Sequence, residues 1–259
     1  MEILQTETAK FEDIKKLVDE ILTHKGDKGD EIELSGDDLL DWICTSQEKS
    51  PPSLHHPRIC LFAKAKDVEE DLKSVTEGTS PLNDFSKHID ADLRVFELSD
   101  KSSGEFDEKD IVMAITYGMM SISDGVDALV LYGLEDKQED VFISDSDADI
   151  VSALKDIQAR SNDRLCALIG AILACRLSKT PVFLNGILAL SAASLLNKID
   201  PYLTEHCIYA GVMKCDQKAL MKDTNIFVLE NESEEMIAQT ALSLIAYWQS
   251  VLYEDRKAI

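Results

Sequence analysis

Four glutamates within residues 230–235 form the best candidate for proton-transfer chemistry in this sequence. Glu232 lies between Glu230 and the pair Glu234 and Glu235, and neighbouring like charges raise the pKa of a carboxyl group toward the range that a general base needs. The same residues also fit the start of a helix, because Asn231 with Glu234 three positions later is a capping-box pattern. From these residues alone, both interpretations of Glu232 stay open.

Residues at the ends of predicted strands are the candidates for holding a ligand. In parallel α/β sheets, ligands bind beyond the carboxyl ends of the strands, where backbone N–H groups favour anions. Gly133 follows one apolar run, and Asn185 with Gly186 follows another. The amide of Asn185 can hydrogen-bond a ribose or a heterocycle, but Asn-Gly is equally typical of a tight turn.

Two lysines also follow a predicted strand. Lys64 and Lys66 come directly after the apolar run 58–63, where they could receive a phosphate. Acidic residues follow at once, at position 67 and from 69 to 71. This pattern favours the interpretation that the lysines begin a solvated helix.

Metal and thiol chemistry has little support in the sequence. His55 and His56 beside Pro57 are typical of an exposed loop, and His88 and His206 lack partners at ligand spacing, so we interpret them as structural. The six cysteines form no CxxC pair and are predicted to be reduced structural thiols. We expect neither a metal nor a cofactor.

A helix-strand-helix unit between residues 162 and 196 gives the clearest evidence for the fold class. Its charge-free stretch 165–175 is too short to span a bilayer, which needs about 20 apolar residues, and is typical of a helix buried against a parallel sheet. Further apolar runs alternate with helix-like segments along the chain. We predict buried strands at 58–63, 92–98, 128–133, 182–184, 207–210 and 225–229.

Strands that alternate with helices predict an α/β fold, with a Rossmann-like parallel sheet and helices on both of its faces. Apolar residues at helical spacing mark a first helix at 11–21 and a last one at 237–252. We predict a small helical N-terminal cap over residues 1–50 and an α/β domain over residues 51–259.

The charge balance excludes some classes of partner. The chain has 49 acidic and 26 basic residues, for a net charge of −23, which disfavours nucleic acids and anionic membranes. The amino-terminal residues lack the basic and apolar regions of a secretory signal, so we expect a cytoplasmic protein.

Several segments resemble, in the same order, those of the nicotinate-nucleotide:dimethylbenzimidazole phosphoribosyltransferases, which make the lower ligand of cobalamin. FDEKDIVMAITYGMMSISDGVDALVLYGLE is similar to the helix and strand that lead to the family's glycine-rich loop, and PVFLNGILALSAASLL to the strand and helix that begin with Asp-Gly. HCIYAG and FVLENESEEMIAQTALSLIAYW resemble the segments that carry a substrate loop and the catalytic glutamate.

The resemblance implies a reaction and a set of residues. Glu232 would take a proton from one nitrogen of a benzimidazole, so that the other nitrogen attacks the ribose of nicotinate mononucleotide and releases nicotinate. The resemblance also implies a homodimer, and substrate contacts by Gly133, Asn185, Gly186 and Gly211.

The motifs that carry this chemistry in the family are altered in the chain. Instead of a Gly-Asn-Thr-Thr phosphate cradle after Gly133, residues 135–149 hold seven acids and one base, which would repel a phosphate. The family's Asp-His-Gly is replaced at 65–67, its His-Arg pair at 212–213 and its framing glycines at 231–235. The chain is also shorter than usual family members, mainly between residues 133 and 164.

Two functions therefore remain open from the sequence. In the first, the chain is a phosphoribosyltransferase-like protein with a degenerate active site that still transfers phosphoribose, with Glu232 as the base and a phosphate site rebuilt from other lysines. In the second, it is a noncatalytic family member that acts as a partner subunit or a small-molecule-binding regulatory protein. The first predicts binding of nicotinate mononucleotide and a benzimidazole. The loop after Gly133 discriminates between the two functions, because it has replaced the phosphate cradle.

Overall fold

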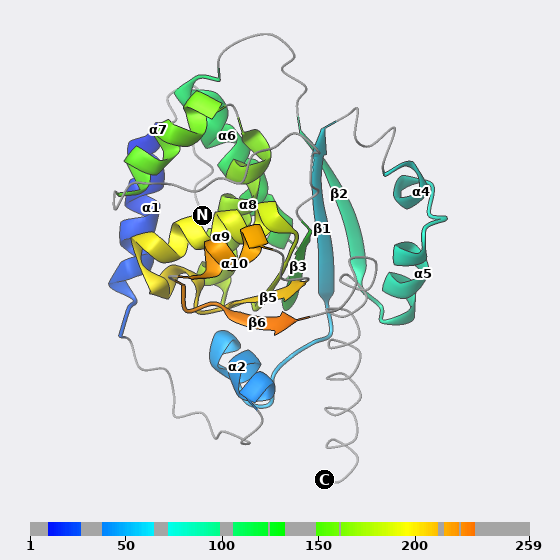
Figure 1. The fold of residues 1–259 in the computed structure, drawn as a ribbon. Helices are drawn as coiled ribbons and strands as arrows, with labels where there is room; N and C mark the ends of the chain where they lie inside the picture. The colour runs from blue at the N-terminus through cyan, green and yellow to red at the C-terminus, as the bar shows by residue number, and fades with distance from the viewer. Residues whose placement is uncertain are drawn as a thin grey trace.

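A six-stranded parallel sheet forms the centre of the molecule (Figure 1). Its strand order is β2-β1-β3-β4-β5-β6, so the direction in which strands are added reverses between β1 and β3. The computed structural model describes residues 10–26, 38–64, 72–98, 106–123, 125–132, 149–160, 162–211, 215–222 and 224–230.

The strands lie where the apolar runs predict them. Each predicted strand is present, and the observed ends differ from the predicted ones by at most two residues. Central strands of a parallel sheet are covered on both faces, so their sequences are continuously apolar. The strands are β1 (Pro57–Lys64), β2 (Asp92–Leu98), β3 (Ala128–Tyr132), β4 (Val182–Asn185), β5 (Cys207–Gly211) and β6 (Phe227–Glu230).

One face of the sheet carries the larger group of helices. Side chains of β1 such as Cys60 and Phe62 join a single apolar cluster with residues of these helices. The helices are α1 (Phe11–Thr23), α6 (Glu108–Met119), α7 (Ile150–Arg160), α8 (Asp163–Ser178), α9 (Ile187–Ile199) and α10 (Cys215–Met221), with the short turns η1 (Met120–Ile122) and η2 (Pro201–Thr204).

The opposite face is covered by α2 (Asp38–Gln47), α4 (Lys73–Thr76) and α5 (Pro81–His88). Ile59 and Leu61, which alternate with Cys60 and Phe62 along β1, belong to a second apolar cluster with Ile43 of α2. Helices therefore cover both faces, and in Figure 1 α4 and α5 lie on the other side of β1 and β2 from α1 and α6. The predicted α/β fold with a Rossmann-like parallel sheet is confirmed.

The helices near the amino terminus pack against the sheet domain. Phe11 and Ile14 of α1 are buried in the larger cluster, and Trp42 of α2 donates its Nε1–H to the carbonyl oxygen of Glu205 at 2.9 Å. The division into a cap over residues 1–50 and a domain over 51–259 stays a prediction. The helix predicted at 237–252 lies outside the described residues.

Two glycines set the distance between α6 and α8. Gly118 lies against the backbone of Ala167, and Gly170 lies against the backbone of Ile115, so that a Cβ atom on either glycine would overlap a carbonyl group. Residues 163–175 of α8 are all buried. The close approach lets α8 pack against α6, and α8 also contacts α9 and β1. Within the described part of the chain, no helix is both long and apolar enough to cross a membrane.

Candidate functional site

The carboxyl ends of the strands gather several of the predicted residues on one edge of the sheet. Tyr132 pairs with Asn185 in the strand register, and Gly211 pairs with Glu230. Asn185, Gly186 and Gly211 therefore lie at the edge where ligands bind in this class of sheet. Gly133 and Glu232 lie outside the described residues, as do residues 133–148 of the acidic segment.

Asn185 links two neighbouring strand ends. It is 2% exposed, and its Nδ2 donates a hydrogen bond of 3.1 Å to the carbonyl oxygen of Ala210 in β5. Gly186, at the N-cap position of α9, has a φ of 83°, a conformation that favours glycine. The Asn-Gly pair thus makes the turn into α9, and its role in binding a substrate stays a prediction.

Lys64 and Asp163 form an ion pair at the same edge. Lys64 ends β1, Asp163 begins α8, and the Nζ atom lies 3.8 Å from Oδ1. The lysine side chain is 22% exposed and the aspartate side chain 5%. Burial raises the pKa of Asp163, and the attraction of Lys64 partly opposes that rise.

This pair corrects one expectation and adds a residue that the sequence did not suggest. The interpretation of Lys64 as part of a solvated helix start is wrong, because it is the last residue of a buried strand and pairs with a buried carboxylate. Lys66 lies outside the described residues. In the sequence, Asp163 is marked only by its position two residues before the charge-free stretch 165–175.

The position of the pair in the sheet is typical of a ligand site. In doubly wound sheets, the crevice that takes the ligand opens where the strand order reverses, and here that point lies between β1 and β3. Lys64 ends β1 at this point. The structure therefore adds Lys64 and Asp163 to the candidate residues at the carboxyl edge.

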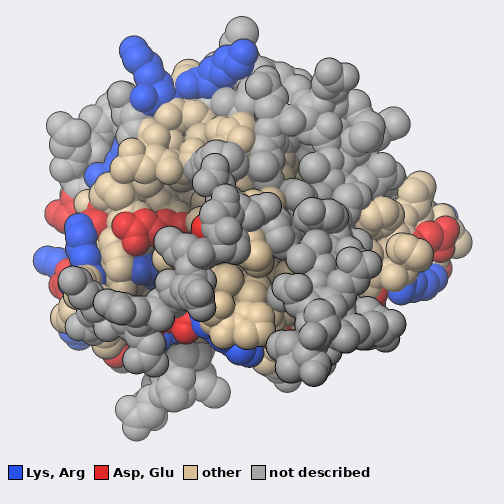
Figure 2. All heavy atoms as spheres, turned by 90° about the horizontal axis from the view of Figure 1, so that it is seen from below, with Lys and Arg blue, Asp and Glu red and all other residues tan. Residues whose placement is uncertain are grey.

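Charge on the described surface is mixed. Figure 2 shows one face of the molecule, on which acidic and basic side chains of the described residues are scattered among uncharged ones. Some of these charges are paired, as in the ion pair between Lys25 and Asp200, at 2.7 Å.

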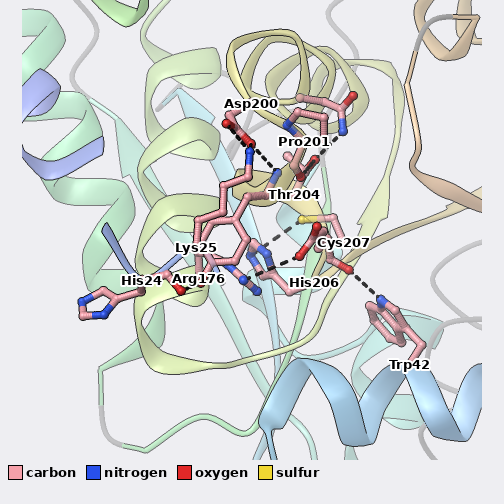
Figure 3. Close-up of polar contacts among 12 residues, drawn as sticks. His24, Lys25, Trp42, Arg176, Asp200, Pro201, Thr204, His206 and Cys207 are labelled. Carbon is pink, nitrogen blue, oxygen red and sulfur yellow. Dashed lines mark hydrogen bonds and ion pairs between the residues drawn. The ribbon is translucent and has the colours of Figure 1, made fainter. Parts of the chain in front are cut away.

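His206 lies in a polar cluster near the amino end of β5, the opposite edge of the sheet (Figure 3). Its side chain is fully buried, and its Nε2 lies 3.1 Å from the carbonyl oxygen of Ile172, the geometry of a donated hydrogen bond. Burial and the nearby Arg176 lower the pKa of His206 to about 3, so the ring is neutral at physiological pH. Its interpretation as a structural residue agrees with this position.

Arg176 joins the elements around that histidine. Its guanidinium lies 3.7 Å from the centre of the Tyr202 ring, and its Nη2 lies 3.8 Å from a carboxylate oxygen of Glu205. A cation over an aromatic face in this geometry is attractive. The cluster fixes α8, η2 and the start of β5 to one another, and we assign it to the scaffold.

The described cysteines are buried and unbonded, at positions 44, 60, 166, 175 and 207. Burial raises the pKa of the Cys60, Cys166 and Cys207 thiols, so these groups remain protonated at neutral pH. Among the described residues, no group of three or more His, Cys, Asp or Glu side chains is placed to hold a metal ion.

Comparisons with known proteins show what the chain is similar to. No family model matches the chain. The nicotinate-nucleotide–dimethylbenzimidazole phosphoribosyltransferase of Brucella anthropi is 24% identical over 233 residues, which cover 68% of this chain and 69% of that protein. The enzyme of the same name from Sinorhizobium medicae is 23% identical over 219 residues, which cover 62% and 65%.

A solved structure agrees with the fold. The crystal structure of the phosphoribosyltransferase of the same name from Thermus thermophilus matches 90% of this chain and 96% of its own, with a TM-score of 0.57 and 12% identity. Together with the segments that resemble the family in order, these matches make the chain similar in sequence to the nicotinate-nucleotide–dimethylbenzimidazole phosphoribosyltransferases, with the same fold as the Thermus thermophilus protein.

Proposed function

We propose that this chain is a phosphoribosyltransferase-like protein whose active site is degenerate and does not transfer phosphoribose from nicotinate mononucleotide. The observation that carries the proposal is the ion pair between Lys64 and Asp163. Lys64 is a cation at the point where the strand order reverses, and a buried carboxylate 3.8 Å away already balances its charge. A phosphate dianion would meet that carboxylate as well as the ammonium.

The altered loops support the same conclusion. Residues 135–149 bring seven acids and one base after β3, where the family's phosphate cradle would stand. Anion sites at the strand ends rely on glycine-rich backbone and on helix N-termini, which acidic side chains oppose. The glycines that would frame Glu232 are also replaced, although its carboxylate remains.

In this proposal the protein acts without catalysis, as a partner subunit or a small-molecule-binding regulator, and forms a homodimer. Exposed apolar side chains support an interface. Met113 of α6 and Met120 of η1 are 45% and 56% exposed and lie seven positions apart, which places them on the same side of a helix. Light scattering on the purified chain measures the mass: the proposal expects a dimer, and a monomer contradicts this part of it.

Thermal melting tests the proposed loss of nucleotide binding. A ligand present at 100 times its dissociation constant raises the free energy of unfolding by about 2.7 kcal/mol. We expect nicotinate mononucleotide to leave the melting temperature of this chain unchanged, under conditions in which it raises that of the Brucella anthropi relative. A rise of similar size in both proteins contradicts the proposal.

A further inference from the structure

The strand β2 lies at one end of the sheet and pairs along one of its sides. It is the outer strand in the order β2-β1-β3-β4-β5-β6, and its strand pairing is with β1 (Figure 1). In the described part of the chain, the backbone groups of Leu93, Val95, Phe96 and Glu97 have no hydrogen-bond partner outside β1. An edge of this kind is a template on which another strand can pair.

The side chains of β2 are more exposed than those of its neighbour. Residues 57–63 of β1 are all buried, whereas six of the seven residues of β2 are half-buried or exposed. Proline and lysine often keep an edge strand from pairing, and residues 92–98 contain neither. The cation of the strand, Arg94, is held by the carboxylate of Asp92 at 2.7 Å.

An apolar stripe on α6 continues this edge. The rings of Phe96 in β2 and Tyr117 in α6 meet edge-on, with their centres 5.6 Å apart. Met113, Tyr117 and Met120 follow one another at spacings of four and three residues, which places them on one side of the helix. The two methionines are 45% and 56% exposed. The edge of β2 and this α6 stripe therefore form one surface of the kind that binds a protein partner.

The sequence of β2 fits a second copy of the same strand. Two edge strands related by a two-fold axis pair antiparallel, and each side chain keeps its face of the joined sheet when the axis passes through a residue. An axis through Val95, the middle of the seven residues, pairs the whole strand with its copy. An axis through Arg94 would instead place two guanidinium groups opposite each other, which is destabilising.

The register centred on Val95 brings complementary side chains together. Arg94 of each copy lies opposite Phe96 of the other, and a guanidinium beside an aromatic ring is attractive. On the other face of the sheet, Leu93 lies opposite Glu97 and Val95 lies opposite Val95. Like charges therefore do not face each other across the axis in this register.

We propose that two copies of this chain associate through β2, with the two strands antiparallel about a two-fold axis at Val95, so that one sheet continues through both copies. The α6 stripes then lie on the same face of the joined sheet and contact the partner. This inference rests on the proposed function, which includes a homodimer, and it assigns the interface of that dimer. A stable dimer buries at least about 1,000 Å² in total, and both the strand and the stripe contribute to that area.

Cysteine cross-linking of the full chain tests the register. In V95C the two new thiols face each other across the axis, where Cβ atoms are about 5 Å apart, within reach of a disulfide. In L93C, on the same face, they are four residues apart along the strand, or about 14 Å, too far for a disulfide. We expect mild oxidation to yield a covalent dimer of V95C, and no more of it with L93C than with the unmodified chain. Equal cross-linking of the two variants, or none in V95C, overturns the proposal.

Charged variants test the contribution of the α6 stripe. M113E/M120E places carboxylates at two exposed positions of the contact, so we expect the dimer dissociation constant, measured by light scattering on dilution, to rise at least about tenfold. A219E adds the same group at an exposed position of α10, which follows β5 at the other end of the sheet, and leaves the constant unchanged. An unchanged constant in M113E/M120E contradicts the proposed interface.

The two proposals fail separately. A dimer that forms without cross-linking of V95C keeps the proposed function and contradicts only the β2 interface. A monomeric unmodified chain contradicts the interface and the homodimer, but not the proposed loss of transfer. Formation of a phosphoribosylated benzimidazole contradicts the proposed function and leaves the β2 interface standing.

Discussion

The Nζ atom of Lys64 lies 3.8 Å from Oδ1 of Asp163, and this contact joins the end of β1 to the start of α8. The pair holds a buried carboxylate at the point where the strand order reverses. Because burial raises its pKa above the usual value, the folded protein binds a proton at Asp163 more tightly than the unfolded chain does. Protonated Asp163 therefore contributes to the free energy of unfolding at low pH, and this contribution is lost as the pH rises through the folded pKa.

D163N tests this effect on stability. At pH 7 we expect its free energy of unfolding to rise, because an uncharged amide replaces a carboxylate whose pKa burial raises. The part of the pH dependence due to Asp163, a loss of stability with rising pH, should disappear. Urea titrations at several pH values measure both, and a strong destabilisation at pH 7 would show that the ion pair outweighs burial.

The contact between α6 and α8 depends on glycine. G118A adds a methyl group that overlaps the carbonyl oxygen of Ala167, so the two helices must move apart. Overpacking of this kind costs about 3 kcal/mol. Chemical denaturation of G118A checks the value, with K109A, at an exposed position of the same helix, as the control. Similar stability of the two variants would refute the close approach.

We expect Asn185 to contribute to the stability of the fold, independently of any role in binding. N185D replaces the amide that donates to the carbonyl of Ala210 with an acceptor facing an acceptor. An unsatisfied buried group costs about 1–3 kcal/mol. S191A is the matched control, since the buried Oγ of Ser191 has no hydrogen-bond partner among the described residues and its loss should not destabilise. If N185D melts like the unmodified chain, this hydrogen bond contributes nothing.

His206 makes stability depend on pH. Its folded pKa of about 3 is below the usual value of about 6.5, so the unfolded chain takes up the proton as the pH falls. This group therefore lowers the free energy of unfolding by about 2 kcal/mol between about pH 7.5 and about pH 5. H206Q keeps a donor toward Ile172 and removes that loss.

H88Q provides the comparison for His206, because the His88 side chain on α5 is exposed. The difference in unfolding free energy between pH 7.5 and pH 5 should shrink in H206Q and persist in H88Q. An unchanged pH dependence in H206Q would mean that the ring is protonated in the folded protein.

The sheet and its helices could be predicted because their signals are local. Central strands such as β3 and β4 are buried on both faces, so their apolar runs stand out from the segments around them. The stripe on α1 was equally clear, since Phe11, Ile14, Val18 and Ile21 are all buried. These patterns depend on which residues are apolar and on their spacing, and the sequence contains both.

The site was harder to predict because it depends on contacts between distant segments. No pattern in the sequence near Lys64 predicts its contact with Asp163. The acidic residues that follow Lys64 instead favour a solvent-exposed segment. Asn185 is a candidate because it follows a predicted strand, but its hydrogen bond to Ala210 follows only from the order of β4 and β5.

The most direct test of the account is a transfer assay on the purified full chain with nicotinate mononucleotide and dimethylbenzimidazole, followed by chromatography of the products. The account predicts no release of nicotinate and no phosphoribosylated benzimidazole above the level without protein. Sustained formation of both products that is abolished in E232Q would contradict it.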